Sequence, residues 1–384
     1  MVKKILIITR CMTGPGPNVL RRQSFARYIL GKGGLIDILG YEKEDSLPVD
    51  AHYYQSKMQV SLVFLKWFFT LFFRYLYLLK AQSIALYVRR VCLAAMTMVS
   101  AEKLIKIKEY DTCLVCIHPW AFYLIIPYLV KHVPTVIDIS DPLYKNAINL
   151  GSDNRANFRL EQTALMAATH VVTMNEPTIQ IMTDEMGINP KKITFVSPAM
   201  NVSSYVKDVH KSFPLHNPIR MIYVGSLYAN YRDFEEIQPA IDNLHGFVGI
   251  DVFSNSGYKS KDSDNFNWHD VIPHKQVLQL YSQYDVILFV DNFYGYQVPS
   301  KIFEIMAQNK PILFVYDKRN TYFYEKLKNQ KGIIFVENKR DEIERVLTRL
   351  CNSNSLSVNY TFDLNDYSEQ STNLKLWKSL FNQA

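Results

Sequence analysis

The sequence predicts an α/β protein of two domains, each built around a parallel sheet. Its 384 residues are too many for one ordinary hydrophobic core and suit two domains of roughly 150 to 200 residues each. Short apolar runs alternate with helical patterns in both halves, which is typical of parallel strands joined by helices. The alternation stops in a polar, proline-containing stretch at 202–218, the predicted interdomain linker. We therefore expect two Rossmann-like domains, at 1–205 and 218–365.

The first domain is predicted to contain a series of strands with helices between them. Each strand is a short apolar run bounded by polar or turn-forming residues. Asn18, a favoured N-cap residue, can start a helix that runs to about Gly31. The strands are expected at 5–8, 35–39, 114–117, 135–139, 171–173 and 193–196.

The second domain repeats this alternation. A helix that starts at Pro299 lies between its third and fourth predicted strands, and a final helix at 366–381 has no strand after it. The strands are expected at 221–224, 248–253, 286–290, 311–315 and 333–336.

The N-terminus and the cysteines favour the cytoplasm. The apolar run at 5–8 is too short for the core of a signal peptide. Five cysteines, an odd number, fit a reducing compartment better than a disulfide framework. Cys113 and Cys116 lie in a predicted buried strand, where residues three apart point to opposite faces, so we expect them in the core.

Positive charge is concentrated in the first hundred residues. They hold 14 of the 43 Lys and Arg residues but only 5 of the 36 Asp and Glu residues. The most apolar stretch of the chain lies in the same region. This combination favours an anionic membrane surface over nucleic acid as a partner.

That apolar stretch, at 60–79, is long enough to span a bilayer. However, Lys66, Thr70 and Arg74 recur every four residues among eight aromatic residues. A charge at mid-membrane costs about 2.5–3.5 kcal/mol, whereas at an anionic surface it contributes about 1 kcal/mol. We therefore predict a helix lying in the interface, with Lys66, Trp67 and Arg74 as membrane contacts. A buried core helix is the alternative.

The segment 295–314 predicts a nucleotide site. Pro299 suits the first helical position, which leaves Ser300 and Lys301 in the first turn with free backbone donors for a phosphate. Glu304 shares a face with Lys301, about 5–6 Å along the helix. A carboxylate there can accept hydrogen bonds from both hydroxyls of a ribose. An ordinary amphipathic helix is the alternative.

A second phosphate-binding loop is predicted after the strand at 221–224. Gly225 and Ser226 follow that strand directly, and glycine lets the backbone approach a ligand closely. Arg232 can return to bind the phosphate in bidentate fashion. With Lys301 it supplies two cations for one diphosphate, so we expect no metal ion. Asp262 and Asp264 form the one Asp-x-Asp that suggests a metal, but they lie in a polar loop without apolar support.

The sequence Pro-Ser-Lys-x-x-Glu at 299–304 resembles the donor-sugar motif of glycosyltransferase family 4, especially its bacterial lipopolysaccharide and capsule members. The resemblance implies retaining enzymes whose two Rossmann-like domains face each other across a cleft (the GT-B fold), with a final segment, 366–384, crossing back onto the first domain. The chain departs from the family at Tyr296, where a first Glu is usual, and at Ser226, where Arg usually follows the glycine.

The resemblance also implies site residues in the first domain, with Gly16 as a donor-binding residue near the donor phosphates and the acceptor. Gly16 lies in a Gly-Pro-Gly-Pro loop after the first strand, His118 ends a later strand, and Asp141 closes an Asp-x-x-Asp. A structural turn, a structural histidine and a helix cap are their respective alternatives. Glu161 matches a further family position, or forms an interdomain salt bridge.

The function expected from these features is that of a retaining glycosyltransferase. It would move a sugar from a nucleotide diphosphate donor, with UDP expected ahead of GDP, to a lipid-linked saccharide at the inner face of the plasma membrane. The expectation includes His118, Asp141, Arg232 and Lys301 as catalytic residues, no cofactor apart from the donor substrate, and no nucleic acid. A nucleotide-sugar 2-epimerase and, because of Tyr296, a non-catalytic sugar-nucleotide-binding partner subunit are the alternatives.

Overall fold

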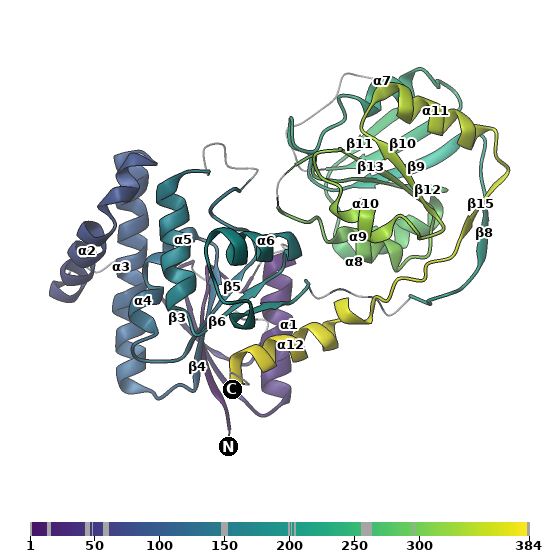
Figure 1. The fold of residues 1–384 in the computed structure, drawn as a ribbon. Helices are drawn as coiled ribbons and strands as arrows, with labels where there is room; N and C mark the ends of the chain where they lie inside the picture. Colours follow the sequence, from purple (N-terminus) through teal and green to yellow (C-terminus); the bar gives the residue numbers. More distant parts are fainter. Residues whose placement is uncertain are drawn as a thin grey trace. The chain divides into compact units, whose positions relative to one another are not determined.

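A computed structural model shows two compact units, Met1–Ala199 with Glu369–Ala384 (unit 1) and Met200–Ser368 (unit 2) (Figure 1). Each unit has its own parallel sheet and its own hydrophobic core. The residues that the structure describes are 2–13, 17–42, 47, 49–56, 61–146, 153–198, 200, 202, 205–254, 263–294 and 296–381.

Within the described residues, unit 1 contains a seven-stranded sheet in the order β3-β2-β1-β4-β5-β6-β7, with every pair parallel. All the strands predicted for this unit are present, with ends that differ by at most two residues. The edge strand β3 was missed because its sequence, His-Tyr-Tyr-Gln, has no aliphatic residue. The strands are β1 Lys4–Ile8, β2 Leu35–Gly40, β3 His52–Gln55, β4 Thr112–Ile117, β5 Thr135–Ile139, β6 His170–Thr173 and β7 Ile193–Phe195.

Helices of very different length surround this sheet. Among the described residues, one helix, α3, is long and apolar enough to cross a membrane by length and composition. Its side chains Tyr87, Val91 and Ala94 are nevertheless buried in unit 1, as in a core helix. The helices are α1 Pro17–Gly31, α2 Leu62–Arg74, α3 Ile84–Ile107, α4 Ile126–Leu129, α5 Arg155–Ala167, α6 Glu176–Gln180 and α12 Glu369–Phe381, with shorter turns η1 Leu76–Lys80, η2 Trp120–Leu124, η3 Ile181–Glu185 and η4 Pro190–Lys192.

The final helix, α12, belongs to unit 1, which confirms that the chain crosses back to its first domain. Leu376 and Leu380 join the core beside α1. At the start of α12, the Ser24 hydroxyl donates to a Glu369 carboxylate oxygen at 2.6 Å, and the Asn373 amide donates to Ser24 Oγ at 2.8 Å. Apolar burial and this polar pair together fix α12 against α1.

Within its described residues, unit 2 contains a six-stranded parallel sheet in the order β11-β10-β9-β12-β13-β14, the same pattern as in unit 1. A small antiparallel pair, β8 with β15, adds to it. Because β8 lies inside the stretch 202–218, the prediction that this whole stretch is a linker is wrong. The strands are β8 Lys211–Pro214, β9 Ile219–Val224, β10 Val248–Phe253, β11 Phe266–His269, β12 Val286–Val290, β13 Ile312–Tyr316, β14 Ile333–Glu337 and β15 Ser355–Val358.

Helices complete unit 2, and α7 and α11 pack against each other. The order of strands reverses between β9 and β12, and in sheets of this kind ligands bind beyond the carboxyl ends of the strands at the reversal. The helices are α7 Ile237–Asp242, α8 His274–Leu280, α9 Lys301–Met306, α10 Tyr322–Leu327 and α11 Arg340–Cys351, with turns η5 Tyr281–Gln283 and η6 Asn365–Tyr367.

Truncating Leu376 to alanine should destabilise unit 1 by about 2–5 kcal/mol, because the buried side chain leaves a cavity between α12 and the sheet. The matched control is Leu374→Ala on the same helix, where the side chain is 41% exposed and the change should stay within about 0.5 kcal/mol. Urea unfolding monitored by circular dichroism measures both. Equal midpoints for the two variants would contradict the packing of α12 described above.

Candidate functional site

The loops after β9 and β12 are joined by one side-chain amide, that of Asn292. The Arg232 guanidinium, in the loop after β9, donates a hydrogen bond to Asn292 Oδ1. Asn292 Nδ2 in turn donates to the carbonyl oxygen of Gln297 at 2.8 Å. Lys301 Nζ reaches back to the carbonyl oxygen of Val224, the last residue of β9, at 3.2 Å. Arg232 and Lys301 are therefore brought to one place at the strand-order reversal.

The two cations are close enough to influence each other. Burial lowers the pKa of the Lys301 ammonium; the nearby Glu304 carboxylate opposes that shift, and the positive charge of Arg232 adds to it. Arg232 Nε is buried and has no hydrogen-bond partner among the residues that the structure describes. A group with negative charge at this place would be stabilised by both cations in surroundings of low polarity.

The start of α9 differs from the prediction. The helix begins at Lys301, with Ser300 as the N-cap residue at φ −59° and ψ −11°, so Pro299 lies outside it and is not its first residue. The amides of Ile302 and Phe303 donate back to the carbonyls of Pro299 and Ser300, at 3.4 and 3.1 Å. These amides are already bonded, and a six-residue helix has a small dipole. Most of the positive potential here therefore comes from the side chains of Arg232 and Lys301.

Glu304 lies on α9 one turn beyond Lys301, as predicted, with its side chain buried. It lies close enough to the buried hydroxyl of Tyr281 to influence it electrostatically. Burial raises the pKa of that hydroxyl strongly, and the nearby Glu304 carboxylate raises it further. The carboxylate thus belongs to the same buried polar region as Lys301.

Gly225 follows β9 directly, and its lack of a side chain has a local cause. A Cβ atom at this position would lie 3.1 Å from the Tyr223 hydroxyl oxygen. That hydroxyl donates to the carbonyl of Ser226 at 3.2 Å and fixes the turn. The glycine is therefore explained by packing against Tyr223, and close approach to a phosphate by Gly225 and Ser226 stays a prediction.

Sequence reasoning missed Asp291 and Asn292. Asp291 is fully buried and accepts a hydrogen bond from the Asn292 amide at 2.7 Å. Burial raises the pKa of Asp291 to about 7, against the opposing effects of that hydrogen bond and of Arg232. A signal was available, since two polar residues directly follow the buried strand β12 at the sheet edge where ligands bind.

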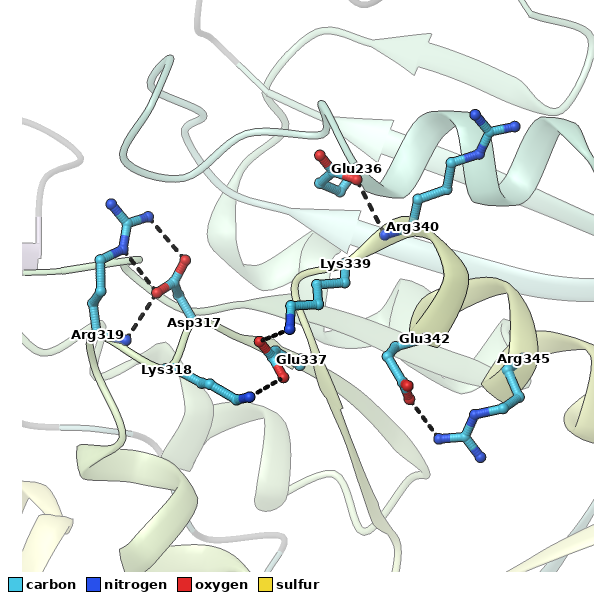
Figure 2. Close-up of polar contacts among 9 residues, drawn as sticks. All are labelled: Glu236, Asp317, Lys318, Arg319, Glu337, Lys339, Arg340, Glu342 and Arg345. Carbon is cyan, nitrogen blue, oxygen red and sulfur yellow. Dashed lines mark hydrogen bonds and ion pairs between the residues drawn. The ribbon is translucent and has the colours of Figure 1, made fainter.

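Charged residues surround the neighbouring strand ends of β13 and β14 (Figure 2). Arg319 forms a two-pronged pair with Asp317, at 2.8 Å for each contact, and its guanidinium lies 5.4 Å from the ring centre of Tyr294. Asn320 donates to the carbonyl of Asn292 at 2.8 Å. The exposed ion pairs contribute little to stability, but this loop supports Asn292 from the side. The other pairs are Lys318–Glu337 at 3.1 Å, Lys339–Glu337 at 2.8 Å and Arg345–Glu342 at 2.5 Å.

In unit 1, His118 and Asp141 follow the ends of β4 and β5, neighbouring strands whose carboxyl ends lie at one edge of the sheet. Burial lowers the pKa of His118, the nearby Asp141 carboxylate raises it, and the positive charges of Arg10 and Arg22 lower it again. His118, Asp141, Arg10 and Arg22 are thus close enough to influence one another electrostatically. Arg10 and Arg22 were not predicted as site residues.

Glu161 anchors the loop that carries Asp141. Its buried carboxylate accepts hydrogen bonds from the Tyr123 hydroxyl at 2.7 Å and from the amides of Tyr144 and Leu143, at 2.7 and 3.2 Å. Because these partners all lie in unit 1, the interpretation of Glu161 as an interdomain salt bridge is wrong. Burial raises the pKa of Glu161 to about 7 despite these bonds.

The other predicted residues are placed as follows. Gly16 and Asp262 lie outside the described residues. Among the described residues, no group of three His, Cys, Asp or Glu side chains is arranged to hold a metal ion. Cys113 and Cys116 are buried in β4, which confirms that they belong to the core. Asp138, the first residue of the Asp-x-x-Asp, forms a buried ion pair with Arg21 at 3.0 Å.

The predicted membrane contacts lie on and beside α2. Lys66 and Arg74 are exposed, and the Arg74 guanidinium lies over the rings of Tyr75 and Tyr128. Trp67 is 7% exposed, and its indole donates to a Glu102 carboxylate oxygen at 2.7 Å. The prediction for Trp67 is therefore wrong, because its side chain packs inward between α2 and α3.

No family model and no curated protein matches the sequence. Solved structures match almost the whole chain. The apo form of the lipopolysaccharide outer core galactosyltransferase WaaB has a TM-score of 0.63 at 12% identity, covering 100% of this chain and 100% of WaaB. HepE of Anabaena, solved with UDP and glucose, has a TM-score of 0.60 at 11% identity, covering 99% of this chain and 95% of HepE.

A Listeria monocytogenes protein assigned as a UDP-N-acetylglucosamine 2-epimerase is also similar, with a TM-score of 0.53 at 8% identity, covering 97% of this chain and 91% of that protein. Together these structures establish the predicted fold, two Rossmann-like domains of the GT-B type. Proteins described as transferases and as an epimerase share it, so the fold alone does not select an activity.

Replacing Glu161 by Gln should reduce the loss of stability at rising pH. The folded-state pKa of about 7 lies above the value of about 4.5 in the unfolded chain, so the folded state binds the extra proton between these values. Stability should therefore fall by up to about 3 kcal/mol as pH rises from 4.5 to 7 and stay level above. Urea unfolding at pH 5, 6, 7 and 8 compares the wild type with the variant, and identical pH dependence would contradict a proton on Glu161.

Proposed function

We propose that the chain is a glycosyltransferase that moves a sugar from a nucleotide diphosphate donor to a lipid-linked saccharide, with retention at the anomeric carbon. The observation that carries the proposal is the pairing of Arg232 and Lys301 at the strand-order reversal of unit 2, with Glu304 one turn further along α9. Two cations suit a diphosphate and the carboxylate suits a ribose. The GT-B fold supports the proposal, since it is shared by WaaB, described as a galactosyltransferase, and by HepE, which was solved with UDP and glucose.

The reaction breaks the bond between the anomeric carbon and the oxygen of the donor diphosphate. A new bond forms to the acceptor hydroxyl oxygen, and its proton passes to the departing phosphate oxygen. Negative charge gathers on that phosphate in the transition state, where Arg232 and Lys301 stabilise it most. Both cations are held in advance, Arg232 by Asn292 and Lys301 by the Val224 carbonyl, so little reorganisation is needed.

We assign the acceptor to unit 1. His118, whose pKa is lowered by burial, can accept a hydrogen bond from a sugar hydroxyl or donate one to it. Asp141 can orient the acceptor hydroxyl. Glu161 acts through its hydrogen bonds to the loop that carries Asp141 and does not itself touch substrate in this scheme. A lipid-linked acceptor places the enzyme at the cytoplasmic face of a membrane.

A nucleotide-sugar 2-epimerase is the second candidate, favoured by the similarity to the Listeria protein. It would use the same diphosphate-binding cations but would need no acceptor. Incubation with UDP-N-acetylglucosamine and with UDP-glucose, followed by analysis of the sugar, separates the two activities. Tyr296, where family 4 usually has Glu, motivates a non-catalytic subunit as a third candidate, which donor hydrolysis or transfer by the purified chain would exclude.

Arg232→Ala and Lys301→Ala should each lower turnover roughly 10²- to 10³-fold while changing donor affinity less, because their charge matters most when the diphosphate departs. Arg345→Ala is the matched control, since this exposed arginine pairs with Glu342 on α11 (Figure 2) and should have full activity. Steady-state kinetics with a donor panel measures all three variants.

The same kinetics should be unchanged in excess chelator, since two fixed cations replace a divalent ion. Activity lost in chelator and restored by magnesium or manganese would contradict this assignment.

Glu304→Gln should weaken binding of the free nucleotide diphosphate by about tenfold or more, because a charge-assisted hydrogen bond to ribose becomes a neutral one. Isothermal calorimetry with UDP and GDP measures this and also compares the bases. Glu325→Gln, an exposed carboxylate on α10 that pairs with Lys328, is the control and should bind as the wild type does. An unchanged dissociation constant for a folded Glu304→Gln protein would remove Glu304 from the site.

A further inference from the structure

The outer face of α2 exposes a continuous row of large apolar side chains. They recur at intervals of three or four residues, which places them in one stripe along the helix and its continuation in η1. The stripe, called the α2 face below, consists of Leu62 (85% exposed), Leu65 (37%), Phe69 (50%), Phe73 (63%) and Leu76 (39%).

The residues of the α2 face do not cover the core of unit 1. The opposite side of the helix, with Phe64, Trp67 and Leu71, is buried, and α2 packs against α3. Figure 1 shows α2 outside α3, on the side away from the sheet of unit 1. The helix is therefore apolar on two sides, and only the inner side is buried within the described part of the chain. Exposed apolar rows of this length mark interaction sites.

The charged residues on α2 and η1 are all basic, and the acidic Glu102 of α3 bonds to Trp67 on the inner side of α2. No Asp or Glu occurs in the sequence from 51 to 101, whereas six Lys and Arg residues do. Lys66 and Arg74 lie on α2 beside the apolar row, and Lys80 and Arg89 are exposed just beyond it. The row itself continues at the start of α3 with Ile84 and Leu86, which are 71% and 40% exposed.

We infer that the α2 face docks the protein on an anionic lipid bilayer, with Phe69 and Phe73 inserted among the lipids and the neighbouring basic residues at the headgroups. A helix whose exposed side carries an apolar row flanked by basic residues is suited to lie in the interface, and 13 residues are too few to cross the hydrocarbon core. A protein partner would supply its own acidic groups, but a bilayer supplies negative charge over the whole width of this face. The inference depends on this surface and not on the transfer reaction.

The test is sedimentation with vesicles of phosphatidylcholine, with and without phosphatidylglycerol. The double variant Phe69→Gln with Phe73→Gln should lower partition onto anionic vesicles at least about tenfold, because both side chains lose their favourable transfer out of water. Phe247→Gln is the matched control, as Phe247 is 54% exposed in unit 2, and it should bind as the wild type does. Lys80→Glu with Arg89→Glu should lower binding to anionic vesicles and leave binding to neutral vesicles unchanged.

Thermal melting and calorimetric titration with UDP accompany each variant. Unchanged melting and UDP binding show that a loss of vesicle binding is local to the α2 face. If the double variant melts early, Leu62→Gln replaces it, since that side chain is the most exposed of the row.

Several outcomes would overturn the inference whatever reaction the protein catalyses. One is a wild-type protein that does not sediment with anionic vesicles. Another is a double variant that binds these vesicles as tightly as the wild type does. A third is a wild-type dimer, seen by light scattering without vesicles, that the double variant lacks, because the α2 face would then join two copies of the chain.

Discussion

The hydrogen bonds of the Asn292 amide hold the donor-side residues of unit 2 together. One side chain accepts from Arg232 and donates to the Gln297 carbonyl, and so links the loop after β9 to the loop that leads into α9. The strands β9 and β12 bring these loops to the same edge of the sheet, but strands alone do not fix side chains. The positions of both cations depend on this amide, since Lys301 begins the helix that follows the Gln297 loop.

Burial gives these groups their electrostatic character. Lys301, Asp291 and Glu161 are ionisable groups that lie in the interior, and in each case burial is the largest cause of the shifted pKa. A buried charge is costly unless it is compensated. Glu161 accepts three hydrogen bonds, whereas Asp291 accepts one from the Asn292 amide. Lys301 is stabilised by the nearby Glu304 carboxylate. Keeping charged and polar groups in such places is a cost to stability that proteins commonly accept at functional sites.

The strands could be predicted because they are short apolar runs, and buried parallel strands require that pattern. Four edge or peripheral strands, β3, β8, β11 and β15, were missed because their sequences are polar, aromatic or only half apolar, as exposed sheet edges often are. Arg232, Lys301 and Glu304 could be located from a local motif. Asp291 and Asn292 could have been suspected from their position directly after a buried strand, but the contact of Asn292 with Arg232 joins loops that are distant in sequence and required the structure. The same holds for the proximity of Arg10 to His118. The burial of the Trp67 side chain also could not be predicted from the sequence, because α2 is apolar on two sides and its sequence does not show which side packs inward.

The return of α12 to unit 1 has a consequence for the order of folding during synthesis. Residues 369–381 supply Leu376 and Leu380 to the core of unit 1, and the other buried residues of this core all lie between Ile5 and Val196 in the sequence. The whole of unit 2 is translated between these two parts. The first unit to be synthesised is therefore completed only after unit 2 has been made. The nascent chain has an uncovered apolar patch beside α1 until residues 369–381 emerge from the ribosome. A chaperone that binds exposed apolar segments would find one on unit 1 throughout the synthesis of unit 2.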